Sequence, residues 1–161
     1  MNFADTNWLA ALYLEADPQD PEAMTRRATV ERYMRFHGGQ LAVSHLVLLE
    51  ARNVFSRVTG ERQPREWAEL EADFDGKLYL DPMNWHLLRR ECEGIFARYA
   101  WRANLGTFDI AIVASAKLAG GTCLLSFDGR LKALAVAEGI EVFPPLDRDG
   151  KEALASLKRA R

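Results

Sequence analysis

The sequence predicts an α/β fold in which a parallel sheet is covered by helices on both faces. Short apolar segments alternate with longer helical patterns along the chain, and the short segments are apolar on both of their faces. Strands of this kind belong to parallel sheets that are buried on both sides. The chain of 161 residues, 48% of them hydrophobic, is long enough to bury one core, so we expect one domain.

The first half of the chain predicts two strands, and each leads into a helix. An apolar start precedes Asp5, after which apolar residues recur at helical spacing. A turn with two prolines ends that helix, and Pro21 can occupy the first position of the next one. Gly38 and Gly39 end the second helix, and Ser44 can cap the helix after the second strand. The expected segments are a strand at 1–4, helices at 8–13 and 22–36, a strand at 40–43 and a helix from 44 onward.

The second half of the chain predicts three more strands. Pro64 begins a helix and Gly76 ends it, whereas Asp81 and Pro82 close the strand that follows. Thr107 is the expected N-cap of an almost wholly apolar helix, which should be buried on most sides. The expected helices cover residues 64–75, 84–99, 107–119, 128–138 and 149–158, and the expected strands cover 77–80, 122–127 and 140–143.

Composition and charge argue against several classes of protein. The 21 basic and 23 acidic side chains give a net charge of −2, so no basic excess by itself indicates nucleic-acid binding. Cys92 and Cys123 are isolated, which disfavours a disulfide framework or a structural zinc site and favours a reducing cytoplasm. The chain begins without a signal peptide pattern, and charged residues or glycines interrupt its apolar stretches, so we expect neither secretion nor a membrane span.

Four acidic residues occupy positions that the predicted topology would bring together. Asp5 ends the first strand and Asp128 ends the fourth, and parallel strands place such ends at one edge of the sheet. Asp109 begins the apolar helix, where an unpaired buried charge would be costly. Glu50 has apolar neighbours on both sides and can face the same crevice. These four carboxylates are therefore the candidate site.

Each of these acids also has an ordinary structural interpretation when it is taken alone. Asp5 and Asp128 suit helix N-caps, and Asp109 suits the first turn of a helix. Glu50 suits a solvated helix face. Together, however, four carboxylates at one edge would repel one another unless a counter-charge lies between them. Mg²⁺ and Mn²⁺ prefer carboxylate oxygens and water, so a site without His or Cys predicts one of these ions.

The acids lie in four short motifs: Asp5-Thr6-Asn7, Leu49-Glu50-Ala51, Thr107-Phe108-Asp109, and Ser126-Phe127-Asp128 before Arg130-Leu131. In this order the motifs resemble the PIN-domain family, and most closely its VapC-like ribonuclease toxins of type II toxin–antitoxin pairs. The resemblance covers nearly the whole chain and implies a three-layer α/β/α fold with a central, mostly parallel sheet of four to five short strands. We expect the domain at residues 1–146, with 147–161 as a C-terminal helical extension that is packed on the domain or trails from it.

The resemblance implies a metal-dependent endoribonuclease that hydrolyses RNA phosphodiester bonds and leaves a 5′-phosphate and a 3′-hydroxyl. Asp5 and Asp109 would be the principal ligands of one or two Mg²⁺ or Mn²⁺ ions. Glu50 and Asp128 would complete the site directly or through water. Two hydroxyls among the supporting residues equally suit capping or turn positions. The supporting residues would be Thr6, Asn7 and Ser126.

The resemblance also implies partners. RNA would be the substrate, and a cognate antitoxin would place a helix in a hydrophobic groove and a basic or aromatic group in the acidic site. Two copies of the chain would pair through helices near 22–36 and 63–74. Arg52 and Arg130 are weak candidates for substrate contacts because they lie near the acidic motifs. Further candidates are Arg57, Arg102, Lys117 and Lys132 for phosphates, and Trp8, Trp67, Trp85 and Trp101 for stacking on bases.

The sequence departs from the family pattern in two places, and rival functions stay open. The first strand has almost no residues before Asp5, and Ile110-Ala111-Ile112 replaces the more usual small or His-containing run. A free-standing RNA-processing nuclease or a non-catalytic RNA-binding module would share the same fold. A phosphate-accepting receiver module fits less well. Such modules carry a pair of adjacent acids after the first strand, whereas here Asp5 stands alone.

Overall fold

The computed structural model describes residues 1–101 and 103–159, which fold around a sheet of five strands. Each strand is parallel to its neighbours, and their order across the sheet is β3-β2-β1-β4-β5. The predicted α/β class and the sheet of four to five short strands are thereby confirmed. The strands are β1 (Asn2–Ala4), β2 (Leu41–Ser44), β3 (Leu78–Asp81), β4 (Cys123–Leu125) and β5 (Glu141–Phe143).

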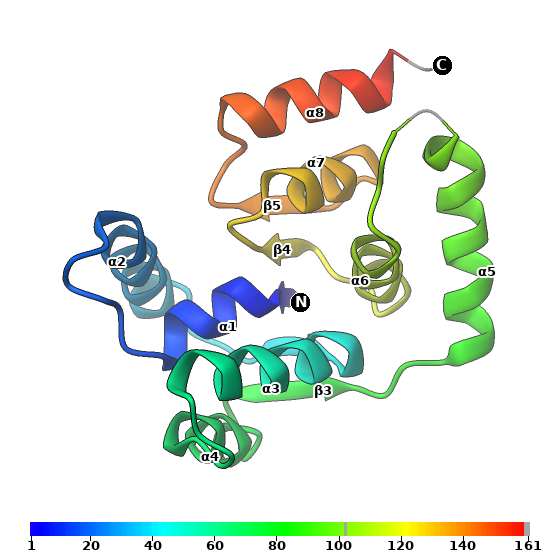
Figure 1. The fold of residues 1–161 in the computed structure, drawn as a ribbon. Helices are drawn as coiled ribbons and strands as arrows, with labels where there is room; N and C mark the ends of the chain where they lie inside the picture. The colour runs from blue at the N-terminus through cyan, green and yellow to red at the C-terminus, as the bar shows by residue number, and fades with distance from the viewer. Residues whose placement is uncertain (102, 160–161) are drawn as a thin grey trace.

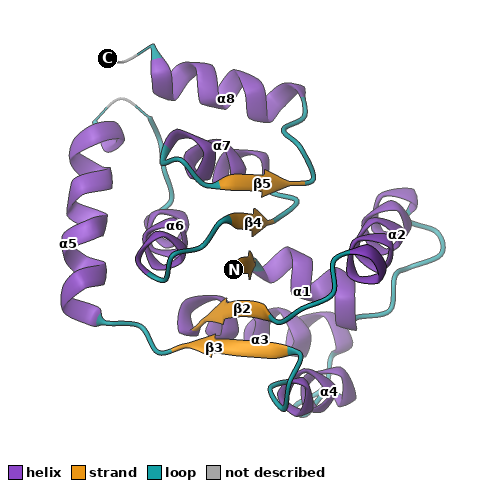
Figure 2. Ribbon diagram, turned by 180° about the vertical axis from the view of Figure 1, so that it is seen from behind, coloured by secondary structure: helices purple, strands orange, loops and turns teal. Residues whose placement is uncertain are grey.

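Helices connect the strands and complete the three-layer α/β/α arrangement (Figure 1). Beyond β5, α8 lies along α7, whereas α4 lies beside α3 near β3 at the opposite end of the sheet (Figure 2). The helices are α1 (Thr6–Tyr13), α2 (Pro21–Phe36), α3 (His45–Thr59), α4 (Arg65–Asp73), α5 (Trp85–Ile95), the π-helical turn η1 (Phe96–Ala100), α6 (Thr107–Leu118), α7 (Gly129–Ala137) and α8 (Arg148–Lys158).

The core lies where the central strands meet α1, α3 and α6. Trp8, Phe55, Ile110 and Leu124 are completely buried there. As predicted, α6 is buried on most sides, since six of its residues lie in the interior. Burial of this much apolar surface is the main force that holds the short strands together. Among the described residues, none of the helices has both the length and the apolar content that crossing a membrane requires.

Several predicted boundaries shift, and one predicted cap is wrong. Gly106, not Thr107, is the N-cap of α6, and no side chain caps this end of the helix. The helix expected at 84–99 is regular only to Ile95, after which η1 continues it as a wider π-helical turn. The helix expected to begin at 149 begins one residue earlier, because Asp147 accepts a capping hydrogen bond from the Gly150 N–H at 2.8 Å.

The register of the two central strands decides which residues meet at the carboxyl edge of the sheet. Ala4 of β1 pairs with Leu125 of β4. The N–H of Asp5 extends this ladder by donating to the Leu125 carbonyl at 3.0 Å. The N–H of Ser126 donates to the Phe143 carbonyl of β5 at 3.0 Å. Asp5 and Ser126, which lie 121 residues apart, therefore leave the sheet side by side.

Candidate active site

Asp5 is a buried carboxylate at the end of the central strand. It occupies the N-cap position of α1, but its side chain makes no capping hydrogen bond. The Ser126 hydroxyl donates to Asp5 Oδ2 at 2.8 Å instead. Only 4% of Asp5 is exposed. The interpretation of Asp5 as a capping side chain is therefore wrong, and the residue lines a pocket instead.

Asn7 and Ser126 join the segments that follow β1 and β4. The N–H of Phe127 donates to Asn7 Oδ1 at 2.9 Å, and Asn7 Nδ2 donates to Ser126 Oγ at 3.4 Å. The N–H of Asp128 donates to the same Ser126 oxygen at 3.0 Å. The Ser126 hydroxyl thus contacts Asp5, Asn7 and the backbone of Asp128 at once.

Asp128 combines a capping role with a place in the site. Its Oδ1 accepts from the N–H groups of Arg130 and Leu131 at 2.7 and 3.0 Å, so it is the N-cap of α7. The same residue lines the pocket that contains Asp5. Because Oδ1 carries both capping bonds, Oδ2 is the oxygen left for other ligands.

Glu50 and Asp109 complete the set from two other helices. Glu50 lies on α3, and the Thr6 hydroxyl donates to its Oε2 at 2.5 Å. Asp109 lies in the first turn of α6 and is half-buried. The structure therefore brings Thr6 and Ser126 into contact with predicted acids, whereas Asn7 contacts Ser126 and the backbone of Phe127.

All four predicted acids line one pocket of about 460 Å³. The pocket also extends along α1, α2 and α3, where its wall is mainly apolar. The residues that line this extension were not predicted, because they depend on how α1 and α2 pack and no local pattern encodes this packing. Its apolar lining residues include Ala10, Ala11, Leu14, Val54 and Val58.

The electrostatics of the pocket reflect carboxylates without sufficient counter-charge. The pKa of Asp5 is raised to about 7, chiefly by burial and also by the charges of Glu50 and Asp128, against the lowering effect of the Ser126 hydrogen bond. The pKa of Asp109 is also raised, first by burial and then by Asp128 and Glu50, while Arg130 lowers it. Both shifts have the sign expected when ionised carboxylates are desolvated near one another.

The donor set of the pocket fits a hard divalent cation. Carboxylate and hydroxyl oxygens line it, and histidine and cysteine are absent from its described lining. In the described part of the chain, no group of three or more His, Cys, Asp or Glu is arranged to hold a metal ion directly. Mg²⁺ commonly keeps several of its waters, so carboxylates that are spread around a pocket suit contact through water.

Most of the basic residues predicted to bind substrate lie outside the pocket that contains the acids. Arg52 donates to the Arg62 carbonyl at 2.7 Å and stacks over Trp67 at 5.3 Å, away from the pocket lining. Arg130 is exposed and lines a groove that adjoins the pocket. Lys117 pairs with Glu91 and Glu138 at 2.6 and 2.7 Å. Arg57 is exposed on α3 outside the pocket lining, and Arg102 falls outside the described residues.

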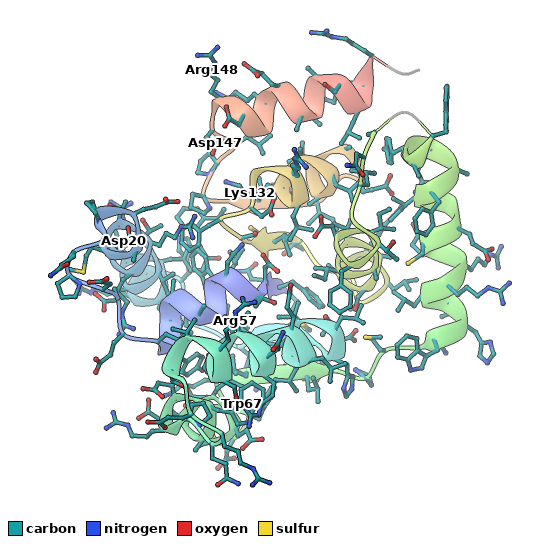
Figure 3. All side chains as sticks on the ribbon, viewed as in Figure 1. Asp20, Arg57, Trp67, Lys132, Asp147 and Arg148 are labelled. Atoms are coloured by element: carbon teal, nitrogen blue, oxygen red, sulfur yellow. The ribbon has the colours of Figure 1, made fainter. Side chains whose placement is uncertain are left out.

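Lys132 is a structural residue in this fold. It is 3% exposed, and its Nζ donates to the carbonyls of Pro144 and Pro145 at 3.2 and 3.3 Å. Figure 3 shows it on α7 close to Asp147, which precedes α8. Burial lowers its pKa, and Asp147 and Asp128 raise it. Lys132 therefore links the segment after β5 to α7 through hydrogen bonds, and its side chain is not positioned to contact a substrate.

The four tryptophans divide between core and surface. Trp8 is completely buried and stacks on Phe127, with ring centroids 5.4 Å apart. Trp67 packs edge-on against Phe55 at 5.7 Å. Trp85 and Trp101 are 65% and 72% exposed, but neither lines the pocket with the acids. Base stacking by tryptophan at this pocket has no support in the geometry.

Comparison with solved structures identifies similar folds. VapC20 of Mycobacterium tuberculosis, described as a sarcin–ricin loop cleaving toxin, has a TM-score of 0.64 at 21% identity, over 87% of this chain and 96% of that chain. The FitAcB structure from Neisseria gonorrhoeae has a TM-score of 0.58 at 15% identity, over 90% and 98%. VapBC2 of Rickettsia felis, bound to a DNA fragment from its promoter, has a TM-score of 0.50 at 14% identity, over 88% and 96%. At these identities the likeness shows a shared fold.

The family assignment rests on the sequence model. No curated protein matches the chain. The PIN domain model matches residues 3–137, which contain all four acids and the three predicted supporting residues. The match agrees with the parallel five-stranded sheet and with the fold of the solved structures. This chain belongs to the PIN-domain family.

Proposed function

We propose that this chain is a metal-dependent endoribonuclease and the toxin of a toxin–antitoxin pair. The observation that carries the proposal is the convergence of four carboxylates, from four separate segments, on one pocket. Membership of the PIN-domain family supports nuclease chemistry. The fold likeness to VapC20, a toxin that cleaves the sarcin–ricin loop, supports RNA as the substrate.

The acids would hold Mg²⁺ or Mn²⁺. Asp5 and Asp109 would be the principal ligands, because burial leaves their negative charges with the greatest need for a cation. Glu50 and Asp128 would complete the site directly or through water. A bound ion of this type lowers the pKa of a coordinated water and neutralises charge that develops on a phosphate.

The protein's own groups keep the carboxylates in place for that task. The Ser126 hydroxyl holds Oδ2 of Asp5. Thr6 holds Oε2 of Glu50 in the same way. Ser126 directly follows β4, and Thr6 lies two residues after the end of β1. Because both donors are attached to the rigid sheet, the carboxylates are fixed before substrate arrives. Such preorganisation is the main contribution that a protein makes to hydrolysis of this kind.

The shape of the pocket supports an antitoxin partner. Its acidic end continues into an apolar wall formed by α1 and α3. An amphipathic helix can place its apolar face on such a wall. A basic side chain from the same helix could then reach the carboxylates. Pairing of two copies through α2 and α4 stays a prediction.

Induced expression in bacterial cells tests the proposed function. We expect growth arrest and discrete RNA cuts with the wild type, and loss of both with Asp5→Asn and with Asp109→Asn. Asp75→Asn is the matched control, because Asp75 is exposed and lies outside the pocket lining. Cuts without growth arrest would favour a free-standing RNA-processing nuclease. Identical behaviour of all four proteins would remove catalysis from the proposal.

Gly106→Ala is expected to slow RNA cleavage without weakening the fold. A Cβ atom at Gly106 would lie 2.9 Å from Asp109 Oδ2, so the carboxylate must move. The backbone of Gly106 has φ −67° and ψ 134°, which alanine adopts freely. A shift of about 1 Å in a catalytic group can cost up to about 100-fold in rate, and we expect a loss of about tenfold or more.

Cleavage assays and thermal melts of the same preparations check this result. Gly38→Ala is the control, because no atom lies within 4 Å of a Cβ at that position. An unchanged cleavage rate in Gly106→Ala would show that the position of Asp109 is not critical. A fall in melting temperature would instead show that the substitution disturbs the fold.

A further inference from the structure

One basic side chain faces the acids of the pocket. Among the described residues that line it, seven are acidic and Arg26 alone is basic. RNA brings one further negative charge per nucleotide, so a strand that enters this pocket meets repulsion from the protein. A cation of the protein beside the acids would therefore have a large influence on binding.

Arg26 lies where the pocket meets a second hollow. It lines both the acidic pocket and an adjoining groove along the start of α7 and α8. Asp128 also lines both spaces, and Arg130 lines the groove. A strand that extends from the carboxylates into the groove would therefore run beside Arg26. The groove itself measures about 960 Å³.

An aromatic stack holds the Arg26 guanidinium in place. Its Cζ lies 5.5 Å from the centre of the Phe127 ring. Phe127 in turn stacks on the buried Trp8, with ring centroids 5.4 Å apart and an angle of 17° between the planes. Phe127 stands between Ser126 and Asp128 in the sequence. The same segment that supplies part of the acidic site thus supports the cation beside it.

The ion pair of Arg26 with Glu22 is weak enough to be shared or replaced. Its Nη2 pairs with Glu22 one helical turn away, and the side chains are 40% and 72% exposed. Exposed pairs of this spacing contribute little to stability. A guanidinium carries five N–H donors, so most of them are left for another acceptor. Phosphate oxygens match that planar donor set in pairs.

We propose that Arg26 binds a phosphodiester of the RNA strand next to the carboxylate site and guides the strand into the α7–α8 groove. This inference rests on the proposed function and names a substrate contact for it. Arg26 acts on binding and not on the reacting atoms. The Phe127 ring serves as its positioning residue.

RNA binding measured by fluorescence anisotropy tests this role. All proteins carry Asp5→Asn, which is expected to bind RNA without cutting it. Each also carries Arg26→Gln, Arg26→Lys or Arg35→Gln. Each double variant is mixed with a short labelled single-stranded RNA in Mg²⁺ buffer. Arg35 is a matched control because it is exposed on the same helix and lies outside both hollows. We expect Arg26→Gln to weaken binding about tenfold, the effect of one charge-assisted phosphate contact. The slope of log K against log salt should fall by about 0.7.

Neutral methylphosphonate linkages, placed one at a time along the RNA, locate the contact. At one position along the RNA, a methylphosphonate should weaken binding to the protein that carries Arg35→Gln. The same methylphosphonate should leave binding to the protein that carries Arg26→Gln unchanged. Arg26→Lys should bind with intermediate affinity, because it keeps the charge and loses the paired donors. A thermal melt of each variant shows that the fold is intact.

The outcomes separate this inference from the proposed function. If RNA binds and Arg26→Gln matches Arg35→Gln in affinity and salt slope, the Arg26 contact is wrong while the nuclease assignment stands. If every linkage affects both variants equally, the contact is also wrong. If the wild type neither binds nor cuts any RNA, the proposed function fails and the Arg26 contact fails with it.

Discussion

Asp5→Asn is expected to abolish RNA cleavage and, in metal-free protein, to stabilise the fold. Loss of a principal metal ligand should lower the cleavage rate by about 100-fold or more. Stability should move in the opposite direction, because Asp5 is 4% exposed and burial raises its pKa to about 7. An asparagine at this position can still accept the Ser126 hydrogen bond but carries no charge to desolvate.

The stabilisation should depend on pH with a definite sign. The folded-state pKa of Asp5 lies above that of an unfolded chain, so the folded protein binds the extra proton between about pH 4 and pH 7. Below this window both states are protonated and the variant should match the wild type. Above it the ionised Asp5 destabilises the wild type, by up to about 4 kcal/mol for a pKa of about 7.

Urea unfolding in the presence of EDTA, at a pH above and a pH below this window, measures the difference. Asp75→Asn is again the control, since an exposed carboxylate has no burial cost to remove. If Asp5→Asn unfolds more easily than the wild type at the higher pH, the charge of Asp5 is already compensated in the metal-free protein. The metal site would then need a different set of ligands.

The fold could be predicted because its signals are local. Short strands that are apolar on both faces indicate a parallel sheet, whichever other strands they pair with. Positions that depend on distant residues could not be predicted in this way. Asp5 and Asp128 both stand at helix N-caps, yet only Asp128 uses its side chain as a cap. The difference arises from Ser126, which lies 121 residues from Asp5 and donates to it.

The four acids that line the pocket were predictable from the sequence, but the basic residue beside them, Arg26, was not. A carboxylate in an apolar stretch is conspicuous in sequence, because burying it alone is costly. Arg26 lies in a helix with many charged residues, and nothing in that helix distinguishes it from Arg35. Its place is set by the stack of Trp8 and Phe127, which come from opposite ends of the chain. Arg52 lies two residues from Glu50 in the sequence, but its contacts with Trp67 and the Arg62 carbonyl hold it outside the pocket lining.

Mn²⁺ is expected to raise the melting temperature of the wild-type protein and to have little effect on Asp5→Asn or Asp109→Asn. The cation binds the pocket of the folded state, where it relieves repulsion among carboxylates that the unfolded chain keeps apart. At a concentration of about 100 times its Kd, such a ligand contributes about 2.7 kcal/mol. For a domain of this size that corresponds to a rise of about 5–10 °C.

The dependence of this rise on pH and on the acids shows whether the pocket is the site. Protons compete with the cation for Asp5, whose pKa of about 7 makes the competition strong in weakly acidic buffer. The rise should therefore be larger at about pH 8 than at about pH 6 in the wild type. Asp75→Asn should respond like the wild type, because Asp75 lies outside the pocket lining. An equal rise in all variants would place Mn²⁺ elsewhere on the surface, and no rise in any would leave the four carboxylates without the cation that their convergence requires.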